Sequence, residues 1–166
     1  ACCWLDAESQ KWVTTSFYPE GLPSAADDMN MVGRITQLAE REWTPRMDIA
    51  MYNRPTEKER KRSFSYINKE CLLQSPAANT LVIELALALQ QAHNLGSDLT
   101  PDLLMLQLNT LSPNAQSDAI ESAEQEDMYL GINQDLGFLM EQLGKRIGKE
   151  NYQIFVIGRP VKGYSA

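Results

Sequence analysis

One stretch of the chain, Ala77 to Leu95, limits the fold more than any other part of the sequence. Leucine, valine, isoleucine and alanine occupy nearly every face of a helix drawn through it. A surface helix has one apolar stripe, whereas a helix that is apolar all round is buried. Ser75 and Pro76 provide a helix start, and Gly96 provides a left-handed end. We therefore predict a buried central helix over 77–95.

This apolar run predicts a core helix rather than a membrane span. It holds about 15 apolar-dominated residues, fewer than the ~20 that cross a bilayer, and Glu84 interrupts it. The chain has 166 residues, of which 43% are hydrophobic and 22% charged, as is usual for one soluble domain. We expect a single globular domain over residues 1–166 that makes no contact with a membrane.

The cysteines and the start of the chain indicate a compartment. The first ten residues have neither the basic flank nor the apolar run of a secretory signal. The three cysteines, Cys2, Cys3 and Cys71, are odd in number and two of them are adjacent, so a set of paired disulfides is not expected. Reduced thiols are typical of the cytoplasm, and we predict a cytoplasmic protein.

Two β-prone runs at 2–5 and 11–18 flank a polar stretch and predict a hairpin. Its tryptophans, Trp4 and Trp12, are expected to pack in the core rather than to form a binding patch. Residues 152–157 have the strongest strand pattern in the chain. Because an isolated hairpin is only marginally stable, we expect this C-terminal strand to pair with it.

Caps, prolines and apolar spacings predict the remaining elements. A short strand is expected over 48–52, and five further helices are expected over about 24–42, 55–74, 101–111, 113–130 and 133–148. The predicted fold is therefore α+β and predominantly helical. About five to six helices would surround the central helix, with a small antiparallel sheet formed by the N-terminal hairpin and the C-terminal strand.

The charges are segregated along the chain. The net charge is −7, yet residues 76–144 contain no Lys or Arg against ten Asp and Glu. Residues 51–75 contain six Lys and Arg against three acidic residues. Such a distribution predicts surfaces of opposite sign, which guide the docking of partners. We expect an acidic, partner-facing surface made by Asp118, Glu121, Glu124 and Asp127.

One basic cluster has aromatic neighbours. It consists of Arg54, Lys58, Arg60, Lys61, Arg62 and Tyr66. Such a cluster can follow the phosphate backbone of a nucleic acid. Glu57 and Lys61 also have the spacing that stabilises an exposed helix face. A solvated helix face, a nucleic-acid contact and a protein-docking surface all remain open for this cluster.

The chemistry of common catalytic sites is absent from the sequence. The one histidine, His93, has no cysteine or acidic residue at metal-ligand spacing, and no glycine-rich phosphate loop or nucleophile elbow is present. We predict no catalytic residue, no metal and no cofactor. The row Glu121, Glu124 and Asp127 resembles the acidic-helix metal sites of all-α nucleotide pyrophosphohydrolases. That family needs a second paired motif, and Glu141 has no acidic residue three positions later, so a solvated acidic face is preferred.

Three function hypotheses follow from these patterns. The preferred one is a non-enzymatic protein-interaction module: an adaptor, an inhibitor or an accessory factor of a larger assembly. It would bind a protein partner and is compatible with homo-oligomerisation. The second is a nucleic-acid-associated accessory protein that uses the basic segment 54–62. The third is a metal-dependent phosphohydrolase built on the acidic row.

Overall fold

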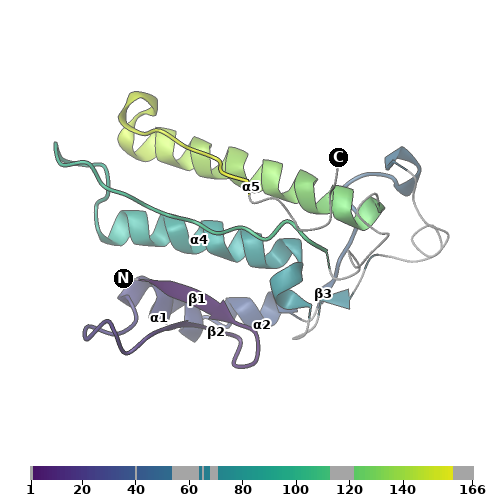
Figure 1. The fold of residues 1–166 in the computed structure, drawn as a ribbon, viewed down its shortest axis with the longest axis horizontal. Helices are drawn as coiled ribbons and strands as arrows, with labels where there is room; N and C mark the ends of the chain where they lie inside the picture. Colours follow the sequence, from purple (N-terminus) through teal and green to yellow (C-terminus); the bar gives the residue numbers. More distant parts are fainter. Residues whose placement is uncertain are drawn as a thin grey trace.

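The fold is α+β, with long helices and two small antiparallel β-ladders (Figure 1). The computed structural model describes residues 2–39, 41–53, 64, 66–67, 71–112 and 122–158. In these residues the α-helices are α1 (Ser24–Met31), α2 (Arg34–Ala39), α4 (Pro76–Ala92) and α5 (Ala123–Ile147). The predicted α+β class is confirmed, but five to six helices are not. None of the described helices is both long and apolar enough to cross a membrane.

Helix α4 is the centre of the described structure, as its all-round apolar sequence predicts. Its side chains contribute to two separate clusters. Leu81 and Leu85 belong to a large cluster shared with the N-terminal hairpin, whereas Ile83 and Leu87 belong to a smaller cluster shared with α5. The helix therefore needs apolar residues on more than one face. Its observed bounds, Pro76–Ala92, begin one residue before the predicted range and end three residues before it.

The predicted N-terminal hairpin is present. Strand β1 (Cys3–Asp6) pairs antiparallel with β2 (Lys11–Thr14), and Trp4 lies opposite Val13. Trp12 is buried, whereas Trp4 is 46% exposed, so the expected core packing of both indoles is right only for Trp12. The side chain of Asn30 in α1 holds the backbone of Trp12 on both sides: its Oδ1 accepts from the N–H at 2.7 Å and its Nδ2 donates to the C=O at 3.0 Å.

The helix predicted over 24–42 is broken in two. Gly33 has a φ of +66°, a left-handed conformation that ends α1 and lets α2 start in a new direction. The chain then forms strand β3 (Arg41–Glu42), which pairs antiparallel with β4 (Tyr66–Ile67). Residues 66–67 are thus in a strand and not in the predicted helix 55–74.

The short strand predicted over 48–52 is also wrong. Residues Ile49–Met51 form a 3₁₀-helix, and the carboxylate of Asp48 accepts a hydrogen bond from the N–H of Ala50 at 2.9 Å. An aspartate at such a position favours a turn over a strand, because its side chain satisfies a nearby backbone donor. A second 3₁₀-helix, Leu72–Gln74, leads into α4.

Helix α5 begins about ten residues earlier than predicted and runs parallel to α4. The side chain of Ser122 caps its start by accepting from the N–H of Gln125 at 3.1 Å. Near the start of α4, Thr80 lies beside Asp135; near its end, the Arg146 guanidinium donates to the C=O of Leu87 at 2.7 Å. Contact positions therefore increase together along both helices (Figure 1).

The helix predicted over 101–111 is absent. These residues are extended and run back along α4 (Figure 1). The side chain of Asn79 in α4 forms two hydrogen bonds with the backbone of Asn109, each of 2.8 Å. The apolar residues alternate, with Leu106 and Leu108 packed against the smaller cluster, while Leu103 and Met105 are exposed. This period of two suits an extended chain, so the helix prediction was wrong.

The C-terminal segment 152–158 is extended but does not pair with the hairpin. It follows α5, whereas the hairpin packs on the opposite side of α4 (Figure 1). Because α4 separates the two, the predicted sheet between the ends of the chain cannot form. The described ladders are limited to β1–β2 and β3–β4.

Candidate functional site

A buried aspartate near the start of α5 gathers the most concentrated set of polar contacts in the described structure. Asp127 is 0% exposed, and four donors reach its carboxylate. They are Trp43 Nε1 at 2.7 Å, the Arg46 backbone N–H at 2.9 Å, Arg46 Nη1 at 2.5 Å and the Tyr52 hydroxyl at 2.5 Å. Paired and fully hydrogen-bonded, this carboxylate fixes residues 43–52 to α5, and we call the arrangement the Asp127 clamp.

Arg46 lies across the surface of α5 at a glycine. Its Nε donates to Gln134 Oε1 at 3.0 Å, one turn and a half beyond Asp127. A Cβ atom built on Gly131 would lie 2.9 Å from Arg46 Nη2, closer than a side chain allows. Gly131 is therefore required by the close approach of the guanidinium.

Tyr52 acts as a hydrogen-bond donor in the clamp. Burial and the hydrogen bond to Asp127 raise the pKa of Tyr52 to about 12. Its hydroxyl also accepts from the Met47 N–H at 3.1 Å. The phenol therefore stays protonated at neutral pH and supports the aspartate rather than transferring a proton.

A row of paired polar residues continues from the clamp along the helices. Thr80 Oγ1 lies 3.1 and 3.2 Å from the carboxylate oxygens of Asp135. Burial raises the pKa of the Asp135 carboxyl, and the Thr80 hydroxyl and the Arg46 charge oppose that rise. Beyond it, Arg34 of α2 forms a bidentate pair with Glu84 of α4, at 2.8 and 3.2 Å.

A shallow pocket of about 330 Å³ opens between β3 and the start of α4. Its polar lining includes Arg41, Thr44, Arg46 and Thr80. Two guanidinium groups and two hydroxyl groups can hold an anion, although Arg46 is already bound to Asp127 and Gln134. The chemistry of these lining groups is recognition of negative charge, because arginine and threonine supply no general base.

The structure corrects part of the predicted acidic surface. Glu124 and Asp127 are buried, because α5 turns their side of the helix toward the chain around Trp43 and Tyr52. Asp118 and Glu121 lie outside the described residues, so the predicted metal row also cannot be placed as one set. Asp127 is occupied by the clamp donors.

The predicted basic cluster lies almost wholly outside the described residues. This holds for Arg54, Lys58, Arg60, Lys61 and Arg62, and of Tyr66 only the backbone, in β4, is described. The binding role of this cluster stays a prediction, as do the single domain, the cytoplasmic location and the protein partner. His93 follows the last residue of α4, and the described residues contain no group of three metal-ligating side chains.

The clamp was not predicted from the sequence. A signal for it exists, since Asp127 stands four residues after Ala123 and four before Gly131. This spacing places the aspartate in the same helix row as two small residues, both of which are buried. An aspartate in a buried row predicts a partnered carboxylate rather than a solvated one.

Comparison with known proteins gives distant but extensive likenesses. No protein-family model matches the chain. It is 26% identical to alkaline phosphatase PafA of Elizabethkingia meningoseptica and to alkaline phosphatase PhoV of Synechococcus elongatus, each match covering 92% of this chain and 31% of the relative. A calcium-transporting ATPase of Myroides odoratus is 25% identical, over 94% of this chain and 32% of the relative.

A solved structure agrees with these sequence matches. The crystal structure of wild-type PafA superposes with a TM-score of 0.74 and 26% identity, covering 90% of this chain and 32% of that one. A PafA mutant gives a TM-score of 0.75 over the same shares. The chain thus spans about a third of the length of the relatives it matches.

These likenesses contradict the prediction of a non-enzymatic interaction module or accessory factor. The alkaline phosphatases in the comparison are enzymes, and their similarity extends over almost the whole chain. The relation was not evident from the sequence alone, because the identity is spread thinly over about 170 residues and forms no short catalytic motif.

Proposed function

We propose that this chain forms the helical layer of a phosphate-ester hydrolase of the alkaline phosphatase type. One observation carries the proposal: the backbone follows that of PafA over 90% of this chain, with a TM-score of 0.74 and 26% identity. A likeness of that extent involves α4, α5 and the segments between them rather than one shared turn.

The described residues suit a supporting role. The parallel helices α4 and α5 are fixed to each other at both ends, by Thr80 with Asp135 and by Arg146 with Leu87. The Asp127 clamp adds a buried attachment for residues 43–52. Phosphatases commonly use metal ions to activate a nucleophile and stabilise the leaving group. In this proposal, residues beyond the described ranges supply those reacting groups.

A helix graft tests the proposal. In PafA, the residues that superpose on α4 and α5 are replaced by residues 76–92 and 123–147 of this chain, and hydrolysis of p-nitrophenyl phosphate is measured. A competent helical layer keeps the reacting groups in place, so we expect kcat/KM within about tenfold of PafA, a loss of at most ~1.4 kcal/mol of transition-state stabilisation.

A matched graft with Leu81→Asp serves as the control. A charge at this fully buried position should prevent folding, which circular dichroism detects and which would show that the grafted helices carry the support. If the unmodified graft fails to fold, or if it folds and hydrolyses the ester more than a thousandfold more slowly than PafA, the proposal is wrong.

A further inference from the structure

The two extended segments on the α4–α5 side have unoccupied strand edges. Residues 103–108 and 153–157 make no hydrogen bond through their backbone to any described residue. Both nevertheless pack against the smaller cluster, through Leu106, Leu108 and Tyr152. Free N–H and C=O groups on an extended apolar chain are a template for pairing with another strand.

The segments run in the same direction. Near the first segment, Leu95 accepts from Gln90 at the end of α4, and Asn109 binds Asn79 near its start, so the chain returns along α4. In the second, the Tyr152 hydroxyl donates to Met140 O at 3.0 Å, and Ile154 lines a groove with Met140 and Glu141, so the chain returns along α5. Because the helices are parallel, the two segments are parallel as well (Figure 1).

Their spacing follows from helix packing. Packed helices lie about 8–10 Å apart, and each segment follows one of the two helices. Neighbouring strands of a sheet are about 4.8 Å apart, so segments one helix spacing apart are separated by about two strand spacings. The absence of a described ladder between them agrees with this geometry. Room for one strand is the consequence.

We propose that this slot between residues 103–108 and 153–157 binds one apolar β-strand from polypeptide outside these 166 residues. The outward side chains of the slot walls are apolar: Leu103 and Met105 are 83% and 82% exposed, and Phe155, Val156 and Ile157 are 80%, 78% and 87% exposed. A strand inserted there would join a parallel sheet, in which strands are apolar on both faces.

The source of the strand is indicated by the relatives. PafA is about three times as long as the part this chain matches, so most of its residues have no counterpart here. The choice of this source rests on the proposed function, whereas the slot itself rests on the geometry. The inserted strand would complete the strand–helix–strand unit formed by residues 103–112, α5 and residues 152–158.

Hydrogen exchange of the full chain tests the slot. The first probe is a lysine-flanked peptide of five valine and isoleucine residues; the second is a set of overlapping peptides from the parts of PafA that this chain does not match. At a peptide concentration of about ten times its dissociation constant, we expect exchange in both segments to slow about tenfold. The same valine and isoleucine peptide with N-methyl groups at alternate residues is the control and should give no protection.

Two variants test strand pairing directly. Successive N–H groups of an extended chain point to opposite edges, so only one of Phe155→Pro and Val156→Pro removes a donor that faces the slot. Both positions are exposed, so folding should be retained. We expect one proline variant to lose peptide binding and the other to keep it, with Val156→Thr binding as the wild type does.

Each result decides between explanations. Protection by the valine and isoleucine peptide alone supports the slot and argues against a PafA-like source for the strand. No protection by any probe, or equal binding by both proline variants, overturns the slot while leaving the helix graft to judge the proposed function. Protection that rises with protein concentration without peptide would assign the slot to a second copy of this chain and overturn the proposed occupant.

Discussion

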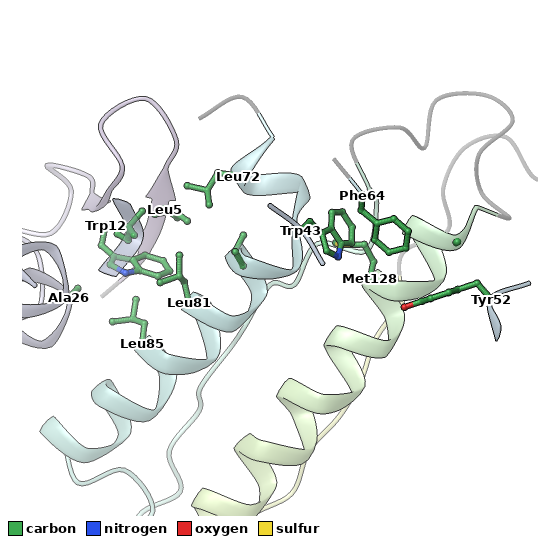
Figure 2. Close-up of a cluster of buried hydrophobic side chains, with 14 residues drawn as sticks. Leu5, Trp12, Ala26, Trp43, Tyr52, Phe64, Leu72, Leu81, Leu85 and Met128 are labelled. Carbon is green, nitrogen blue, oxygen red and sulfur yellow. The ribbon is translucent and has the colours of Figure 1, made fainter. Parts of the chain in front are cut away.

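The two sides of α4 differ in how they are covered. The closed side, at Leu81 and Leu85, is covered by a hydrogen-bonded hairpin and by a cluster that extends to Trp43, Tyr52 and Met128 (Figure 2). The open side, at Ile83 and Leu87, is covered by α5 and by two extended segments without strand partners among the described residues. A helix can therefore be apolar all round while only one of its sides is completed within the described chain.

The largest expected effect comes from breaking the Asp127 clamp, which holds Trp43 and Tyr52 in the closed-side cluster. Asp127→Ala leaves Arg46 without its buried counter-charge, and such a loss costs about 3–5 kcal/mol of unfolding free energy. Urea denaturation measures it. Glu141→Gln, which removes the partner of the exposed Lys145, is the control and should not change the midpoint. A clamp variant as stable as the wild type would contradict the role given to Asp127.

Truncation on the two sides of α4 compares them directly. Leu81→Ala on the closed side should cost about 4 kcal/mol, and Leu87→Ala on the open side about 2 kcal/mol, within the 2–5 kcal/mol range of buried leucines. The thinner open side can relax around the smaller side chain, which limits its loss. Denaturation of both variants measures the difference, and equal losses would remove the distinction between the sides.

A pH effect is expected at Asp135, beside Thr80. The folded protein binds the Asp135 proton more tightly than the unfolded chain does, since burial raises the pKa of this carboxyl. Stability thus carries a penalty above the raised pKa, and the penalty disappears as the pH falls toward the ordinary value of 3.8.

Asp135→Asn removes that titration and keeps an oxygen for the Thr80 hydroxyl. The difference in unfolding free energy between wild type and variant should therefore shift in favour of the wild type between neutral pH and pH 3.8. Thermal melts at several pH values measure this difference. A constant difference, or a shift of the opposite sign, would show that burial does not control this group.

The smallest effect is expected at the pair between Arg34 and Glu84, at the edge of the closed side. The two side chains are 37% and 30% exposed, so solvent screens their attraction. Glu84→Gln should cost less than about 1 kcal/mol, and the cost should decline further in high salt. Melting at two salt concentrations checks it, and a large loss that salt does not change would indicate a buried role.

The sequence predicted the elements whose local patterns agree with their surroundings. Helix α4 and the N-terminal hairpin belong to this group, because apolar runs, caps and a polar loop all favour one structure. The helix predicted over 101–111 failed for a tertiary reason: Asn79 binds the backbone of Asn109 and favours an extended chain. No local pattern reports a contact between residues 30 positions apart.

The candidate site was harder to predict than the fold. Its donors come from Trp43, Arg46 and Tyr52, about 80 residues before Asp127, and each has an ordinary polar or aromatic neighbourhood in the sequence. The acidic character of residues 118–127 drew attention to a surface, while the burial of Asp127 depends on which way α5 faces. Only the small residues Ala123 and Gly131 record that orientation.

Gly131 gives a way to trace this architecture in other sequences. A helix usually excludes glycine from its interior, and here the residue is kept by the guanidinium that lies across it. The two positions should therefore change together during divergence: a homologue with alanine at 131 should no longer carry arginine at 46, and one with a smaller residue at 46 gains helix stability by replacing the glycine. Counting such paired exchanges would date the clamp relative to the rest of the helical layer.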